Sequence, residues 1–326
     1  RPEDVGVIAR KLIASLQQSF VINGQEVFTS ASVGVSLYPT DGEEVETLLR
    51  NADTALYEAK AEGKGTYRLF SDRLREQAVH RLTLERDIRL ALEREEFRVY
   101  YQPQVDLQTG HIVGMEALVR WERPSYGLVG PVEFLPCAEE TGLIKELGAW
   151  VLRTACYQAQ RWNQRGYSPL RVAVNLSSIQ FRDARLIGWV QQVLEETGLP
   201  ADLLELELTE SVAILGVKDV TAKLCCLADL GIRLAVDDFG TGYSSLNLLK
   251  HMPFTHVKID KSFIDGILGD PRDAAVVKAI IGMANSLQLA VTAEGVESAS
   301  QVDVCRAYEC RFIQGHVFSP AVSAEQ

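Results

Sequence analysis

The stretch LAVDDFGTGYSSL, residues 234–246, begins as an apolar run that stops at two adjacent carboxylates, Asp237 and Asp238, and continues into a glycine-rich turn. Such a run is typical of a buried strand, and a carboxylate held beside a core is costly unless its charge is compensated. In the ordinary explanation, Asp238 caps the next helix and Asp237 meets water. The alternative is a metal or phosphate site, which requires other strands to end in polar residues as well.

The region from about residue 96 alternates between strand-like and helix-like segments. The predicted strands are 97–107, 112–121, 170–177, 203–210, 232–239, 256–261, 289–297 and 310–318. Most are apolar on both faces, which is typical of parallel strands covered by helices, so we predict an α/β fold with a TIM-like (β/α)8 barrel. LQTGH (107–111) joins the first two strands without a helix, so we expect an antiparallel first strand. A doubly wound open sheet is the alternative, although no GxGxxG follows a predicted strand.

The first 70 residues follow a different pattern. The predicted elements are a helix at 5–18, alternating residues at 25–39, a helix at 45–65 and a short strand at 66–70. These elements are too few for a self-sufficient core, so we expect 1–70 to be an incomplete α+β domain. Residues 71–95 are rich in charge and carry helical spacing, which predicts a linker helix before a barrel domain at 96–326.

Composition excludes several classes of protein. The net charge of −11 argues against a DNA or RNA partner. No apolar run approaches the roughly 18 residues of a membrane span, and no signal segment opens the chain, so we expect no membrane contact, although upstream domains of a longer parent could anchor it. The six cysteines form no CxxC pair, which favours reduced thiols and a cytoplasmic location. No HExxH is present, which argues against a zinc peptidase.

Polar residues recur where the predicted strands end. They are Glu116, Asn175, Glu207, Glu210, Asp237, Asp238, Lys258, Asp260, Glu294, Glu297 and Gln314. One such acid alone would be explained as a helix cap. In a barrel, however, the C-terminal strand ends meet at one mouth, where clustered carboxylates repel one another by several kcal/mol. Oxygen ligands with an amide from Asn175 and no Cys or His favour Mg²⁺ or Mn²⁺, and the cluster has room for two ions, which suits displacement at phosphorus.

Two further pairs suggest how such a site works. Lys258 and Asp260 are two residues apart, so they point to the same side of a strand. We expect Lys258 to orient a water and to stabilise charge on a phosphoryl group, the alternative being a structural ion pair with a neighbouring Glu. Asp260 would bind a metal or hold a water. Arg120, four residues after Glu116, would grip a phosphate, the alternative being an ion pair with Glu122 or with an acid of a loop.

Seven motifs occur in order along the chain. They are EALVRW (116–121), NLSSIQF (175–181), ELTES (207–211), DDFGTGYSSL (237–246), KIDKSFI (258–264), AEGVE (293–297) and QG (314–315). From about residue 80 to the C-terminus, the chain resembles the EAL family of cyclic-di-GMP phosphodiesterases. The resemblance implies a TIM-like barrel that uses Mg²⁺ or Mn²⁺ to hydrolyse one phosphodiester bond of cyclic di-GMP, giving linear pGpG.

The same resemblance implies roles for individual residues. The implied metal positions are Glu116, Asn175, Glu207, Asp237, Asp238 and Glu294, with Asp260 close to a second ion. Lys258 is implied to contact the attacking water, so we expect Lys258, Glu116 and Asp260 to carry catalysis. The implied substrate contacts are Gln102, Arg120, Glu297 and Gln314. Glu210 is implied to steady the DDFGTGYSSL loop, which contributes to a dimer interface in this family, so we expect a homodimer through the barrel.

Residues 30–71 resemble the C-terminal half of a GGDEF (diguanylate cyclase) domain. The GGDEF signature and the nucleotide-binding front half are absent from this chain, so we expect no cyclase activity from it. His316 stands where many EAL members have Tyr, and we expect it to alter packing or a base contact without abolishing catalysis. Two other functions stay open: a cyclic-di-GMP receptor without turnover, and an unrelated metal-dependent barrel enzyme such as an enolizing lyase. Family receptors usually lack the first glutamate, one paired aspartate or the lysine, all of which are present here.

Overall fold

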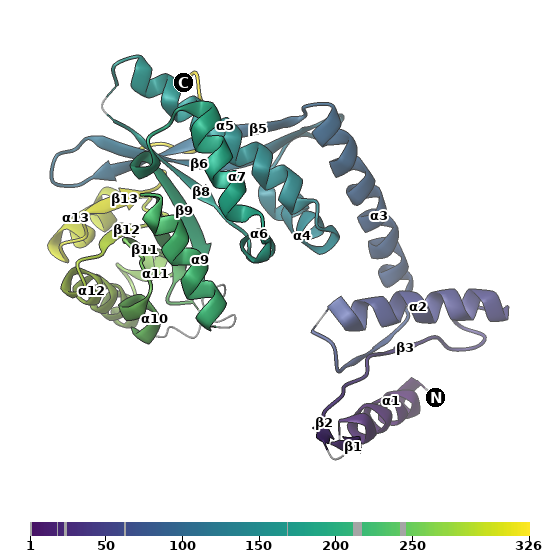
Figure 1. The fold of residues 1–326 in the computed structure, drawn as a ribbon. Coiled ribbons are helices and arrows are strands. Elements are labelled where there is room, and N and C mark those ends of the chain that lie inside the picture. Colours follow the sequence, from purple (N-terminus) through teal and green to yellow (C-terminus); the bar gives the residue numbers. More distant parts are fainter. Residues whose placement is uncertain are drawn as a thin grey trace. The chain divides into compact units, whose positions relative to one another are not determined.

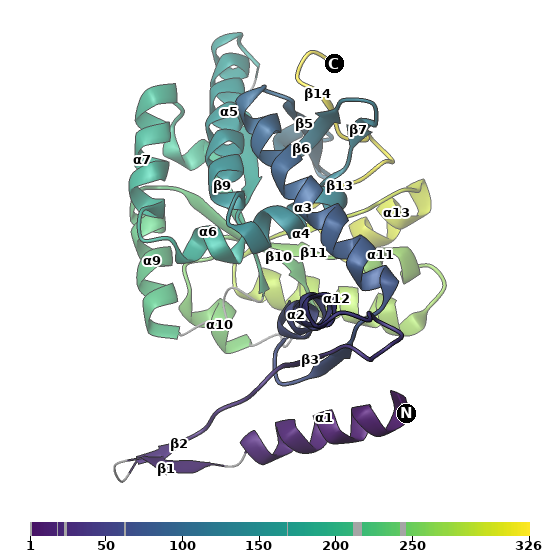
Figure 2. The same cartoon turned by 90° about the vertical axis from the view of Figure 1, so that its right-hand side faces the viewer.

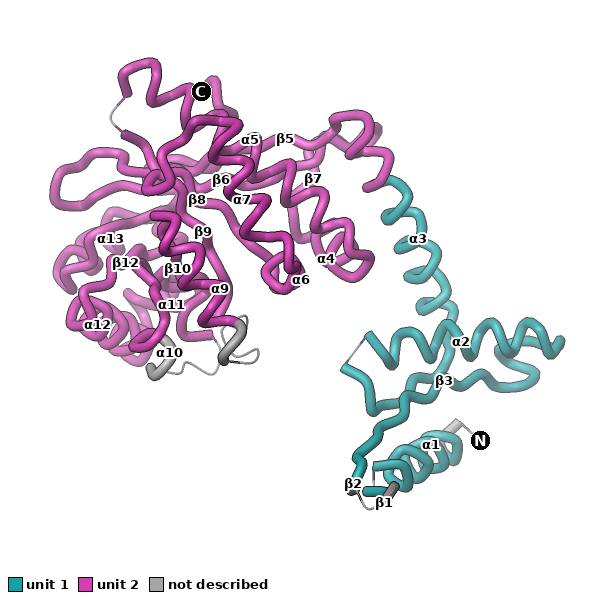
Figure 3. The backbone as a smooth tube through the Cα atoms, in the orientation of Figure 1, with its two compact units in different colours: residues 1–87 teal, residues 88–326 magenta. Residues whose placement is uncertain are grey.

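The computed structural model describes residues 2–17, 19–22, 25–61, 63–167, 169–210, 217–241 and 246–326. The chain forms two compact units, residues 1–87 and 88–326 (Figure 3). Helix α3 (Asp72–Glu93) runs across the boundary between them. Within the described residues, no helix combines the length and apolar character that a membrane span requires.

Among the described residues of unit 2, eight strands close into a barrel (Figure 1). Around the barrel they are β5 (Phe97–Asp106), β13 (Phe312–Gln314), β12 (Ala290–Ala293), β11 (His256–Ile259), β10 (Arg233–Phe239), β9 (Leu204–Thr209), β8 (Arg171–Asn175) and β6 (Ile112–Arg123). β5 is antiparallel to both β6 and β13, whereas the other neighbouring pairs are parallel. Two short strands, β7 (Gly127–Val129) and β14 (Val322–Ser323), pair with β6 and β5. The predicted barrel with its antiparallel first strand is confirmed.

Helices pack around the outside of the strands (Figures 1 and 2). They are α4 (Pro131–Thr141), α5 (Ile144–Gln164), α6 (Ser178–Arg182), α7 (Leu186–Thr197), the 3-10 turn Ala201–Leu203, α9 (Val217–Asp229), α10 (Leu246–His251), α11 (Lys261–Gly266), α12 (Pro271–Ser286) and α13 (Ala299–Ala307). Leu204, Leu206 and Leu208 of β9 are fully buried beneath this layer. The covering helices explain why the strands read as nearly continuous apolar runs.

Side chains that alternate with these leucines meet across the barrel interior. Glu205 and Glu207 on β9 reach His256 and Lys258 on β11, although β10 lies between the two strands. Because side chains two residues apart share a face of a strand, these contacts form two polar layers. The upper layer, with Glu207 and Lys258, is nearer to the C-terminal strand ends.

Unit 1 contains α1 (Pro2–Leu16), β1 (Phe20–Ile22), β2 (Gln25–Val27), β3 (Val33–Val35), α2 (Val45–Ala61) and β4 (Tyr67–Leu69). The alternating stretch 25–39 is not one strand: β2 forms an antiparallel hairpin with β1, and β3 pairs in parallel with β4. Ala55 and Ala59 of α2 are buried, and a Cβ on Gly34 of β3 would lie 2.0 Å from the Ala52 carbonyl oxygen. A glycine at position 34 therefore permits the close approach of β3 to α2.

Candidate active site at the barrel mouth

Lys258 lies at the centre of an acidic site at the barrel mouth. Its Nζ is 2.6 Å from Glu207 Oε2 and 2.6 Å from Glu294 Oε1. It is also 3.3 Å from Glu116 Oε2 and 3.3 Å from Asp237 Oδ1, and the Lys258 side chain has no exposed surface. These residues belong to β6, β9, β10, β11 and the residue that follows β12. The barrel thus brings together polar residues that are far apart in the sequence.

Amide side chains hold the Glu116 carboxylate in place. Asn175 Nδ2 donates a hydrogen bond to Glu116 Oε1 at 2.6 Å, and Gln314 Nε2 donates to Glu116 Oε2. Gln314 Nε2 also donates to Gln102 Oε1 at 3.0 Å, and Gln102 Nε2 donates to the Ser319 carbonyl at 3.2 Å. Asn175 and Gln314 therefore hold the Glu116 carboxylate directly, and Gln102 is linked to it through Gln314.

The paired aspartates of β10 lie beside this cluster. Carboxylate oxygens of Asp237, Asp238 and Glu294 lie within 4.8 Å of one another. Asp238 adopts a left-handed backbone with φ of 52°, and its side chain lies close to that of Asp260, whose charge helps to raise the pKa of Asp238. Asp260 also caps α11 by accepting the Ser262 N–H at 3.1 Å. Asp237 and Asp238 thus belong to a constellation of carboxylates.

Burial and mutual repulsion control the protonation of these side chains. Burial, with the neighbouring carboxylates, raises the pKa of Glu207 well above its ordinary value and that of Glu294 to about 8, against the opposing charge of Lys258. Burial and the adjacent aspartate raise the pKa of Asp238 to about 6. Burial also acts on Glu116, but the Lys258 charge and the amide hydrogen bonds outweigh it and lower its pKa. For Lys258, the surrounding carboxylates outweigh burial and raise its pKa, so the amine is protonated.

The cluster fits divalent cations. One ammonium cannot balance all of these carboxylates, which explains the raised pKa values of Glu294 and Asp238. In the described part of the chain, the buried oxygen Glu207 Oε1 accepts no hydrogen bond, and Asp237 Oδ1 has only an ion-pair contact with the Lys258 ammonium 3.3 Å away. Leaving buried acceptors unsatisfied is costly, and carboxylate and amide oxygens are the ligands that hard divalent cations prefer.

A cavity of about 250 Å³ opens beside the cluster. Gln102, Glu297 and Gln314, which were predicted to contact substrate, all line it. Arg120 is half-buried, donates a hydrogen bond to the Val119 carbonyl at 2.9 Å and lies 5.9 Å from the Tyr100 ring centroid. Among the described residues, Glu122 pairs with Arg98 at 2.9 Å, and no ion pair joins it to Arg120.

Comparison with known proteins agrees with this geometry. The EAL domain profile matches residues 85–321, and the diguanylate cyclase GGDEF domain profile matches residues 2–66.

The chain belongs to the EAL domain family.

Two of its relatives come from Pseudomonas aeruginosa. The bifunctional diguanylate cyclase/cyclic di-GMP phosphodiesterase MucR is 42% identical over 100% of this chain and 47% of its own length. The cyclic di-GMP phosphodiesterase NbdA is 41% identical over 96% of this chain and 40% of its own. This EAL chain thus spans about half, or less, of the length of each of these two relatives.

Solved EAL structures share the barrel. The MucR phosphodiesterase in complex with c-di-GMP has a TM-score of 0.73 and 42% identity, covering 75% of this chain and 99% of that one. The FimX EAL domain from Pseudomonas aeruginosa bound to c-di-GMP has a TM-score of 0.67 and 27% identity, covering 73% of this chain and 96% of that one.

The structure adds residues to this EAL site that reasoning from the sequence missed. Lys261 lines the cavity and lies 2.7 Å from Glu297 Oε1 and 2.8 Å from Asp265 Oδ1. The sequence did offer one signal for Lys261: it directly follows Asp260, a predicted site residue, at the start of α11. The buried pair of Glu205 and His256 was also missed, because its contact crosses the barrel.

One expected feature of this EAL site lies outside the described residues. Residues 211–216 and 242–245 are not described, and the latter belong to the DDFGTGYSSL loop. The expected support of this loop by Glu210, and the loop's expected contribution to a dimer, therefore stay predictions. Glu210 itself is buried at the end of β9.

Proposed function

We propose that this chain hydrolyses one phosphodiester bond of cyclic di-GMP to linear 5′-pGpG. The observation that carries the proposal is the buried Lys258 ammonium, held among the carboxylates of Glu116, Glu207, Asp237 and Glu294 at the barrel mouth. The relatives MucR and NbdA, which are named as cyclic di-GMP phosphodiesterases, and the MucR complex with c-di-GMP support this substrate.

We propose that two Mg²⁺ or Mn²⁺ ions bind this site. The residues that would hold them are Glu116, Asn175, Glu207, Asp237, Asp238, Asp260 and Glu294. Asn175 donates a hydrogen bond from Nδ2 to Glu116, so the side-chain carbonyl oxygen of Asn175 stays available to a cation. When bound, such ions stabilise charge on phosphoryl oxygens and lower the pKa of water.

The chain's own residues orient the reactants. Because the carboxylates keep it protonated, Lys258 donates to the attacking water and stabilises negative charge on the phosphoryl group. Glu116 and Asp260 hold the reacting centre in place beside it. The amides of Gln102 and Gln314 and the carboxylate of Glu297 contact bases or riboses from the cavity wall. Arg120 grips a phosphate, and Glu210 steadies the loop after β10.

The remaining organisation is proposed on similar grounds. Residues 1–70 are the C-terminal half of a GGDEF-like domain, 71–95 are a linker helix, and 96–326 are the phosphodiesterase, which forms a homodimer through the barrel. The net charge of −11 supports the absence of a nucleic-acid partner. All six cysteines, each in a described part of the chain, are free thiols, which supports a cytoplasmic location without membrane contact of its own.

A single assay tests the activity. The chain is incubated with cyclic di-GMP and Mg²⁺, with added chelator, and as the Glu116→Ala variant. Metal-dependent formation of pGpG that both controls abolish supports the enzyme. Tight binding of cyclic di-GMP without turnover in Mg²⁺ or Mn²⁺ would instead show a receptor.

A further inference from the structure

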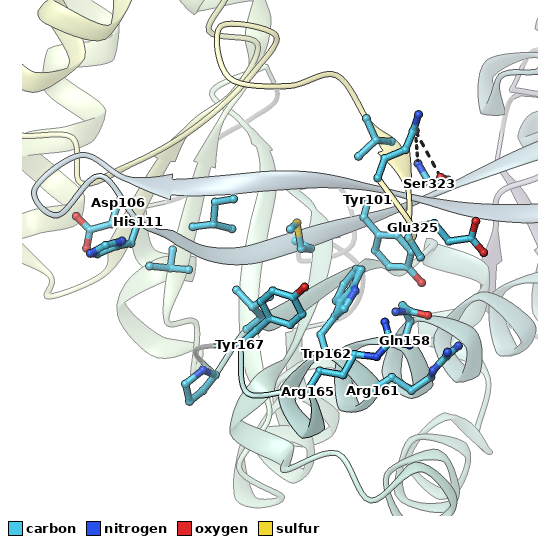
Figure 4. A pocket seen from close by; sticks show the side chains of 18 of the residues that line it. Tyr101, Asp106, His111, Gln158, Arg161, Trp162, Arg165, Tyr167, Ser323 and Glu325 are labelled. Atoms are coloured by element: carbon cyan, nitrogen blue, oxygen red, sulfur yellow. Dashed lines mark hydrogen bonds between the residues drawn. The ribbon is translucent and has the colours of Figure 1, made fainter.

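A second cavity, of about 1040 Å³, lies on the outer face of the barrel wall. The β5–β6 hairpin, the C-terminal end of α5 and residues 322–326 line it (Figure 4). Tyr101 lines this cavity, whereas its neighbour Gln102 points into the barrel and bonds Gln314. Because successive side chains of a strand point to opposite faces, the wall of β5 separates this cavity from the mouth.

Buried aromatic rings with unused donors face this cavity. Tyr101 and Trp162 meet edge to face, with ring centroids 4.8 Å apart and planes at 76°. The Tyr101 side chain is 2% exposed and that of Trp162 is 9% exposed. Within the described residues, neither the Tyr101 hydroxyl nor the Trp162 indole N–H has a hydrogen-bond partner. Both polar atoms keep access to the cavity, where they can donate hydrogen bonds to the acceptor atoms of a ligand.

Two arginines give the cavity a positive edge on a chain with an overall charge of −11. Arg161 and Arg165 are four residues apart at the end of α5, so they lie on one face. Neither guanidinium has an ion pair or a hydrogen bond in the described part of the chain, and Figure 4 shows both beside Trp162. Of the acids that line the cavity, Asp106 is paired with Arg311 at 3.2 Å, and Glu325 stays available as an acceptor.

We propose that this cavity binds a purine nucleotide. The base packs against Trp162 and the exposed ring of Tyr167, and its amino or ring N–H group donates to Glu325. The phosphate accepts from Arg161 and Arg165, which suit an anion that carries several acceptor oxygens. The cavity volume fits a ligand of this size and exceeds that of a simple anion.

The test is a titration of the full chain with GMP in the presence of a chelator, followed by calorimetry and by tryptophan fluorescence. We expect saturable binding that weakens at least tenfold in the double variant Arg161→Ala/Arg165→Ala. Arg153→Ala is the matched control on the same helix, since Arg153 pairs with Glu196 away from the cavity. It should leave GMP affinity within twofold of the unaltered chain. The affinities are compared only for variants whose melting temperature equals that of the unaltered chain.

Two controls make the proposal falsifiable. If Arg120→Ala abolishes GMP binding and the double variant does not, the nucleotide sits at the barrel mouth and the proposal fails. If inorganic phosphate binds as tightly as GMP, the site is only an anion site and the proposal also fails. A parallel titration with linear pGpG shows whether the cavity prefers a mononucleotide or a dinucleotide. Binding of either ligand that weakens in the double variant supports the site.

Discussion

The Lys258 ammonium lies 2.6 Å from Glu207 Oε2, and neither side chain has any surface exposed to solvent. An ion pair so deeply buried is stable only while both partners are present, because either charge alone would be left uncompensated in a medium of low dielectric constant. Lys258 is therefore both the proposed reacting group and the counter-charge on which the metal-free barrel depends.

Replacing Lys258 by Met should remove both roles. We expect pGpG formation to fall at least ~100-fold, because charge on the phosphoryl group loses its donor. The metal-free chain should lose about 3 kcal/mol of unfolding free energy, because the buried Glu116 carboxylate, whose pKa the Lys258 charge lowers, loses its counter-charge. Turnover assays and urea unfolding measure the two effects, with Lys250→Met, a substitution at an exposed residue of α10, as the control. Turnover within threefold of the unaltered chain would contradict the proposed role.

Asp238→Asn tests the paired aspartates without disturbing the backbone. Asp238 has a φ of 52°, which asparagine tolerates well. Asparagine removes a carboxylate that its neighbours repel, so above pH 6 in chelator we expect a melting temperature no lower than that of the unaltered chain. We also expect weaker Mg²⁺ activation and turnover lower by a factor of ~100 or more. Asp229→Asn, at an exposed position at the end of α9, is the matched control. If saturating Mg²⁺ gives Asp238→Asn full activity, Asp238 is not a ligand.

The stability of the metal-free chain should fall as pH rises. Burial raises the pKa of Asp238 to about 6 and that of Glu294 to about 8, both above the values of about 4 in an unfolded chain. A raised folded pKa means that the native state holds the proton more tightly. Its stabilising contribution is complete below about pH 4 and is lost as pH rises through the folded values.

We therefore expect the melting temperature in chelator to decline between pH 5 and pH 9, whereas Mg²⁺ should reduce the decline by replacing the protons. The lowered pKa of Glu116 and the raised pKa of Lys258 place their titrations outside this range. Glu294→Gln should flatten the upper part of the profile. A melting temperature that rises over this range in chelator would contradict the charge balance described for the site.

Gly315→Ala should damage the wall of the mouth cavity. A Cβ at this position would lie 2.1 Å from the Val296 carbonyl oxygen, which is backbone and accepts the Val317 N–H at 3.0 Å. We expect a loss of about 3 kcal/mol in unfolding free energy and reduced turnover. Gly188→Ala in α7 is the control: within the described residues nothing lies within 4 Å of the added Cβ, so it should stabilise the chain by about 0.5 kcal/mol. Equal effects of the two substitutions would contradict this packing argument.

Much of the barrel was predictable because its signals are local. Apolar strands covered by helices read as continuous runs, and the short LQTGH link requires an antiparallel neighbour, which β5 confirms. The prediction was weaker in unit 1, where the stretch 25–39 divides into β2 and β3 with different partners. Strand pairing there depends on α1 and α2, which periodicity along one segment does not reveal.

The sequence alone determined the kinds of residue at the strand ends, and hence that an acidic mouth would need a cation. Only the tertiary structure decided which of them meet. Lys258 bonds both Glu207 and Glu294, Asp238 lies beside Asp260, and the Arg120 guanidinium lies over the Tyr100 ring. The physical reason is that contacts across a barrel depend on strand stagger and side-chain rotamers. Both are set by the packing of the whole closed sheet, and neither is written in the spacing of a single segment.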